Sequence, residues 1–139
     1  MTYFNVLSIV REGAITDPAK AMGMVEPIFD VTRIGLERHQ GKDAHFIVSA
    51  DYEKIVNGES LFRVKVTTTW LIVGLDKNEE DKEFSFLKML IVRSVSHLYG
   101  ELACTFQDNN WPMMLPHHDP DFTKSFEMTK LALRDFFKA

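Results

Sequence analysis

Histidine and carboxylate side chains are the strongest candidates for chemistry in this sequence, and three of them stand together as His117-His118-Asp119. Imidazole and carboxylate groups bind zinc and iron, so His118 and Asp119 could each supply one ligand. Neighbouring residues of an extended chain point to opposite sides, so a complete site would need further ligands. The partners that the sequence offers are His45, His97 and Glu101. A polar turn is the simpler interpretation of this segment.

His97 and Cys104 could each have either a catalytic or a structural role. His97 lies beside a predicted apolar helix stripe, where a histidine is more often packed or capped than catalytic. Cys104 would be a nucleophile only if a neighbouring histidine activated its thiol, and no recognisable motif surrounds it. The sequence also has no glycine-rich phosphate loop, no Gly-x-Ser-x-Gly elbow and no His-Glu-x-x-His pair. These patterns favour a protein without catalytic residues and without a cofactor.

The length and composition are those of one globular domain, residues 1–139. The chain has 139 residues, of which 45% are hydrophobic and 26% charged, enough to bury a core. Its formal net charge is −4 and it has no long basic stripe, which argues against nucleic-acid binding. A single cysteine excludes an intrachain disulfide, and the start of the chain lacks the pattern of a signal peptide. No apolar run reaches the roughly 18 residues of a membrane span, so we expect a cytoplasmic protein without membrane insertion.

Alternation of apolar and polar residues predicts an antiparallel sheet in the first half of the chain. Between Phe46 and Tyr52, every second residue is apolar and shares one face of a half-buried strand. Asn57-Gly58 follows, the strongest short signal for a hairpin, because both residues tolerate a positive φ. The last strand begins with one polar face and ends apolar on both faces. The expected strands are Tyr3–Val10, Ile28–Leu36, His45–Val56 and Leu61–Leu75.

A helical period replaces this alternation in the second half. Apolar residues recur at helical spacing from Phe84 to Phe106 and again from Asp121 to Phe137. Between them, three prolines in Trp111–Pro120 exclude regular structure, although the segment is rich in large apolar side chains. The predicted fold class is therefore α+β: a four-stranded antiparallel sheet followed by a long helix, an extended crossing segment and a C-terminal helix.

Two stretches of sequence carry a family resemblance. The first is Phe62-Arg63-Val64-Lys65-Val66 with Trp70-Leu71-Ile72-Val73, a strand that ends in an aromatic and aliphatic patch. The second runs from Leu98-Tyr99-Gly100-Glu101 through Trp111-Pro112-Met113-Met114-Leu115-Pro116 to Asp119-Pro120-Asp121-Phe122. In these stretches, and over about Ile28 to Phe126, the chain resembles the SecB-like chaperone family. Members that dock on the SecA motor carry an acidic residue in the last strand where this chain has Arg63 and Lys65, which favours a divergent member that works apart from export.

The resemblance implies a function, an assembly and a set of contacts. Such proteins hold unfolded polypeptides without ATP, assemble as dimers of dimers, and offer apolar contacts to extended clients in a groove between the sheet and the crossing segment. The matching positions here are Phe62, Val64, Trp70, Tyr99, Trp111, Met113 and Met114. The expected protein is an ATP-independent holdase, a homodimer or homotetramer with unfolded polypeptides as partners and no cofactor, and protein export is a related process.

Two other functions stay open on the residues alone. One is a small metal- or histidine-dependent enzyme with its site near His117-His118-Asp119. The other is an adaptor that binds a single folded partner. Tightly bound stoichiometric metal would favour the enzyme, and a single specific partner in place of many unfolded ones would favour the adaptor.

Overall fold

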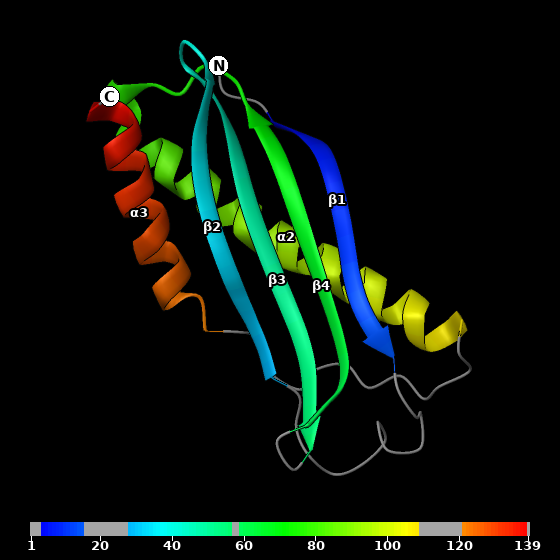
Figure 1. Ribbon diagram of the computed structural model, residues 1–139. Coiled ribbons are helices and arrows are strands. Elements are labelled where there is room, and N and C mark those ends of the chain that lie inside the picture. The colour runs from blue at the N-terminus through cyan, green and yellow to red at the C-terminus, as the bar shows by residue number, and fades with distance from the viewer. Residues whose placement is uncertain (1–3, 16–27, 57–58, 109–120, 139) are drawn as a thin grey trace.

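Runs of β-branched and aromatic residues form the strands of this protein. The computed structural model describes residues 4–15, 28–56, 59–108 and 121–138. Adjacent strands are antiparallel, and they lie in the order β1-β4-β3-β2 (Figure 1). The strands are β1 (Phe4–Ile15), β2 (Ile28–Gln40), β3 (Asp43–Val56) and β4 (Glu59–Ile72).

Tight connections set the register of this sheet. Gln40 pairs with Asp43, and Gly41 between them has a φ of 58°, a left-handed conformation that glycine adopts without steric cost. The hydrophilic sequence Gln40-Gly41-Lys42-Asp43 itself favours a polar turn at this position. At the other end of β3, Val56 pairs with Glu59, and the predicted Asn57-Gly58 turn lies outside the described residues.

β1 and β2 extend well past their predicted ends, whereas β4 ends at Ile72, before the predicted Leu75. β1 continues past Val10 to Ile15, and β2 continues past Leu36 to Gln40. In both cases the ladder of the neighbouring strand supplies hydrogen-bond partners for the additional backbone groups. Pairing across the sheet therefore outweighs the local tendency of Gly13 to interrupt a strand.

The long helix α2 (Glu80–Asp108) covers one face of the sheet and forms the core with it. Figure 1 shows α2 crossing behind the strands. The alternation predicted for β3 is confirmed, because its apolar face is buried between the sheet and this helix. Buried side chains on this face of β3 and β4 are Phe46, Val48, Ala50, Tyr52, Val64, Val66, Thr68, Trp70 and Ile72, and those of α2 are Leu87, Leu90, Ile91, Ser94, Val95, Leu98 and Leu102.

Helix α2 begins earlier than predicted, at Glu80 instead of Phe84. A 3-10 turn (η1, Lys77–Glu79) precedes it, and the Asp76 side chain accepts a hydrogen bond from the Asn78 backbone N–H at 2.9 Å. The first turn of α2 is acidic, which suits the positive end of the helix dipole. The charged run Asp76–Glu83, whose composition alone favours a solvated connector, is thus in part the start of the helix.

The C-terminal helix α3 (Thr123–Lys138) lies beside β2 (Figure 1). At its start, the Asp121 carboxylate accepts a hydrogen bond from the Thr123 backbone N–H at 2.9 Å. Near its end, Arg38 of β2 donates from Nη2 to the carbonyl of Phe136 at 2.6 Å. The same guanidinium lies 4.0 Å from the centroid of the Phe136 ring. Arg38 therefore joins the end of α3 to the sheet.

The predicted α+β class is confirmed: an antiparallel sheet precedes a long helix and a C-terminal helix. The predicted crossing segment, Trp111–Pro120, lies outside the described residues. Within the described part of the chain, no helix is both long enough and apolar enough to cross a membrane.

Truncation of Leu98 to alanine should destabilise the fold strongly. Leu98 is fully buried between α2 and the sheet, so Leu98→Ala should lower the free energy of unfolding by about 2–5 kcal/mol, measured by urea denaturation. Leu131→Ala is the matched control, because Leu131 is 60% exposed on α3, and its cost should stay below about 0.5 kcal/mol. Equal costs for the two substitutions would contradict this placement of the core.

Candidate functional site

The structure separates the residues predicted to bind peptide. Val64 and Trp70 of β4 are 3% and 2% exposed, beneath α2. Tyr99 of α2 is half-buried, and its ring lies 5.3 Å from that of Phe29. The side chain of Phe62 and all of Trp111, Met113 and Met114 lie outside what the structure describes. Of the predicted set, Tyr99 is thus the described side chain that reaches the surface.

Polar contacts hold Trp70 in place beneath α2. Its indole Nε1 donates to the Ser94 hydroxyl at 2.8 Å, and Ser94 donates to the carbonyl of Leu90, also at 2.8 Å. The His97 ring stacks on the indole with 5.6 Å between ring centroids. His97 Nδ1 also lies 3.1 Å from the Thr68 hydroxyl. These contacts orient the large aromatic ring and satisfy its N–H inside the core.

Burial lowers the pKa of His97 from its usual value of 6.5. Desolvation disfavours the imidazolium, so the folded protein favours the neutral ring. The packed position that the sequence suggested for His97 agrees with these contacts.

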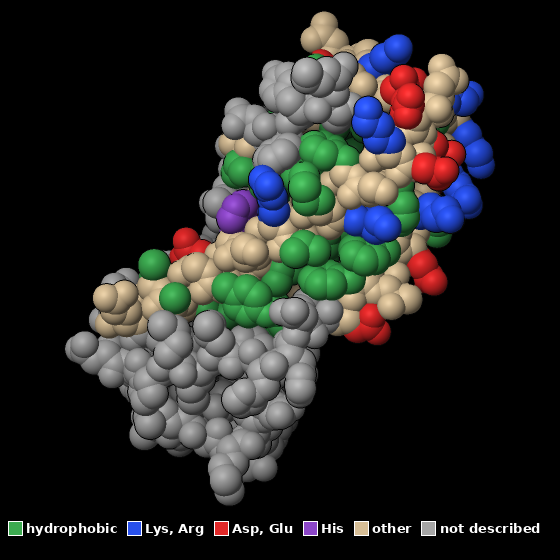
Figure 2. All heavy atoms as spheres, turned by 180° about the vertical axis from the view of Figure 1, so that it is seen from behind, with side chains coloured by type: hydrophobic (Ala, Val, Ile, Leu, Met, Phe, Trp, Pro, Cys, Tyr) green, Lys and Arg blue, Asp and Glu red, His purple; other side chains and the backbone are tan. Residues whose placement is uncertain are grey.

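The structure leaves a set of apolar side chains partly exposed along the two helices and β2, here called the apolar strip. It consists of Phe84, Val92 and Tyr99 on α2, Phe29 on β2, and Phe122 and Phe126 on α3. Figure 2 shows hydrophobic side chains gathered over the face of the molecule that carries the two helices. On α2 these positions are spaced by eight and seven residues, spacings that recur on one face of a helix, and this spacing is the signal in the sequence.

Ring contacts and one cation join members of the apolar strip in two groups, which together span three elements. The Lys88 ammonium lies 4.7 Å from the centroid of Phe84 on its own helix and 5.6 Å from that of Phe126 on α3. Phe126 in turn stacks on Phe122 at 5.6 Å. With the Phe29–Tyr99 pair, the strip brings together side chains that are distant in sequence. It provides a partly solvated aromatic surface suited to apolar ligands.

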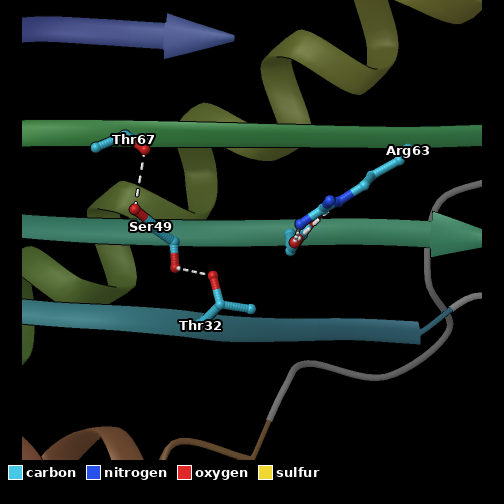
Figure 3. Close-up of polar contacts among 5 residues, drawn as sticks. Thr32, Ser49, Arg63 and Thr67 are labelled. Carbon is cyan, nitrogen blue, oxygen red and sulfur yellow. Dashed lines mark hydrogen bonds and ion pairs between the residues drawn. The ribbon is translucent and has the colours of Figure 1, made fainter. Parts of the chain in front are cut away.

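The opposite face of the sheet is polar. The hydroxyls of Ser49 and Thr67 lie 2.9 Å apart, and Thr32 donates to the carbonyl of Ser49 at 3.5 Å (Figure 3). Arg63 forms a bidentate ion pair with Asp51. Its Nη2 donates to Oδ2 of Asp51 at 2.7 Å, and its Nε donates to Oδ1 at 3.1 Å. Cross-strand pairs of this kind hold neighbouring strands in register. They also engage Arg63, one of the two basic residues that distinguish this chain from the resembled family.

Two of the partners proposed for the predicted metal site lie on opposite faces of the sheet. His117-His118-Asp119 lies outside the described residues, and that part of the prediction is untested. His45 alternates with buried Phe46 and so lies on the polar face, whereas His97 contacts Thr68 on the helix-covered face. The sheet therefore separates these two histidines. Within the ranges that the structure describes, no three His, Cys, Asp or Glu side chains form a group that could hold a metal ion.

The stability of the fold should fall in mild acid because of His97. Its folded pKa lies below 6.5, so its stabilising contribution is complete above pH 6.5 and is lost as the pH falls toward the folded value. Urea denaturation at pH 7.5 and pH 5.5 should show a larger loss of stability for the wild type than for His97→Gln, which does not titrate there. Parallel losses in the two proteins would mean that His97 does not titrate differently in the folded state.

Removing either partner of the Asp51–Arg63 pair should have unequal effects. The Asp51 side chain is 12% exposed and that of Arg63 is 50% exposed. Arg63→Met leaves a mostly buried carboxylate without this partner and should cost about 1–3 kcal/mol. Asp51→Asn leaves a guanidinium that water can solvate, so its cost should be smaller. Urea denaturation of the two single variants and the double variant measures the coupling, and a larger cost for Asp51→Asn would contradict this assignment.

No protein-family model matches the sequence, and no curated protein matches it. The resemblance to the SecB-like family over residues 28–126 therefore stays a prediction, and functional inference depends on the side chains described above.

Proposed function

We propose that this chain is an ATP-independent chaperone that holds unfolded polypeptides on the apolar strip between α2 and α3. The supporting observation is the strip itself, a set of aromatic and aliphatic side chains that the core leaves partly exposed. Exposed apolar surface commonly marks an interaction site. The strip contains Tyr99, which belongs to the peptide-binding set predicted from the sequence.

The chemistry of the strip suits clients of varied sequence. Burial of apolar area is non-directional, so it favours exposed hydrophobic segments of many sequences over one defined partner. Met89, which is 37% exposed, lies one helical turn from Val92 and adds a flexible side chain that can adapt to different ligands. Lys88 sits over two of the rings and leaves a cation beside them for the polar groups of a bound chain. None of these contacts requires a nucleotide.

The proposal extends to the segment between the two helices. α2 ends at Asp108 and α3 begins at Thr123, so residues 109–122 connect the two helices that carry the strip. We assign Trp111, Met113 and Met114 to the same binding surface because they are large apolar residues in the stretch of sequence that joins these helices. The extended crossing segment, assembly as a homodimer or homotetramer, and a cytoplasmic location belong to the proposal as well.

Suppression of aggregation tests the proposal directly. A chemically unfolded client is diluted into buffer without ATP, and light scattering is followed at increasing ratios of this protein to client. The wild type should suppress scattering near equal molar amounts. Met89→Gln with Val92→Gln removes two exposed apolar side chains at about 0.7 kcal/mol each, so suppression should need roughly ten-fold more protein.

The matched control is Leu131→Gln, because Leu131 is the more exposed apolar side chain but lies on the charged outer face of α3. This variant should suppress scattering like the wild type. Trp111→Ala with Met113→Ala tests the extension into the connecting segment and should weaken suppression. If a large excess of the wild type leaves scattering unchanged, the chaperone proposal is wrong.

A further inference from the structure

Two histidines lie together on the polar face of the sheet, at the closed end of the β2–β3 hairpin. His39 of β2 and His45 of β3 have ring centroids 4.6 Å apart, with 31° between the ring planes. His39 is exposed and His45 is half-buried, so the pair is open to solvent on one side. This pair lies across the sheet from the apolar strip and is independent of the proposed chaperone function.

An irregularity in β2 produces this juxtaposition. The register shifts between Arg38, which pairs with Ala44, and Gln40, which pairs with Asp43. His39 is the additional residue of this bulge, and bulges redirect the side chain that they carry. The next turn is short, so the two strands are held closely at this point. The backbone thus brings the two imidazoles together before any ligand is bound.

The nearest cation in sequence does not occupy the space beside the pair. Arg38 is directed to the other face of the sheet, where it bonds to the Phe136 carbonyl and covers the Phe136 ring. Glu37, the register partner of His45, has its carboxylate 3.9 Å from the Arg33 guanidinium. The two imidazoles are therefore the candidate ligands, and the Arg38 guanidinium is held away from them.

We infer that His39 and His45 form a bidentate site for a divalent transition metal of the Cu²⁺, Ni²⁺ or Zn²⁺ class. Imidazole nitrogen suits these ions, and metal–nitrogen bonds of about 2.0–2.1 Å require two nitrogens within about 4 Å of each other. Rings with centroids at 4.6 Å meet this requirement after a small rotation about the side-chain bonds. Water completes the coordination, and the bound ion links β2 to β3.

Metal titration of the full chain tests the site. Isothermal titration with NiCl₂, CuCl₂ or ZnCl₂ is done in a Cys104→Ser background, because the exposed Cys104 thiol binds the same ions. One ion per chain should bind, and His39→Asn or His45→Asn should each weaken binding at least ten-fold. A hundred-fold excess over the dissociation constant should raise the Tm by roughly 5–10 °C in the parent protein and not in these variants.

His117 and His118, which are neighbours in the sequence, supply the control. His117→Asn with His118→Asn should leave the affinity and the rise in Tm unchanged. With Cu²⁺, the electron paramagnetic resonance spectrum should show coupling to two nitrogens, and to one in either single variant. The inference is overturned if both single variants bind like the parent, or if binding is lost only in the His117/His118 variant.

Discussion

Burial of one face of the sheet beneath α2 is the constraint on which the rest of this structure depends. β3 and β4 present alternate apolar side chains on that face, and α2 meets them with a stripe that includes Leu87 and Leu98. At about 25 cal/mol per Å² of apolar surface removed from water, this interface is the main favourable contribution to folding. Trp70 lies within it, and its indole N–H would be costly to bury without the Ser94 hydroxyl.

Because of this burial, polar side chains find their hydrogen-bond partners differently on the two faces of the sheet. On the covered face, polar groups such as Thr68 and Ser94 occur where a partner crosses from the other element. On the polar face, neighbouring strands satisfy one another through Ser49–Thr67 and Asp51–Arg63. In the part of the chain that the structure describes, every buried side-chain nitrogen or oxygen has a hydrogen-bond partner. The sheet is therefore apolar toward α2 and hydrogen-bonded within itself on its other side.

The two candidate sites occupy different surfaces for the same reason. The apolar strip forms where α3 meets the flank of α2, because two helices on one sheet leave aromatic side chains along their junction partly exposed. The His39–His45 pair lies on the face that neither helix covers, at the end of a hairpin. Arg38 lies at the same bulged end of β2, but its guanidinium is directed to the covered face, where it bonds to the end of α3. Substitutions at one site can thus be made without altering the other.

The sequence by itself determined the class of fold, the buried face of β3, the turn at Gly41 and the presence of two helices. These features depend on local periodicity and on backbone preference, which a single chain segment expresses. Only the tertiary structure decided that β1 passes Gly13 and that Phe29 meets Tyr99. It alone brought His39 beside His45. Periodicity reports which face of an element is buried, whereas these contacts depend on which residue of another element lies opposite, and a one-residue bulge changes that.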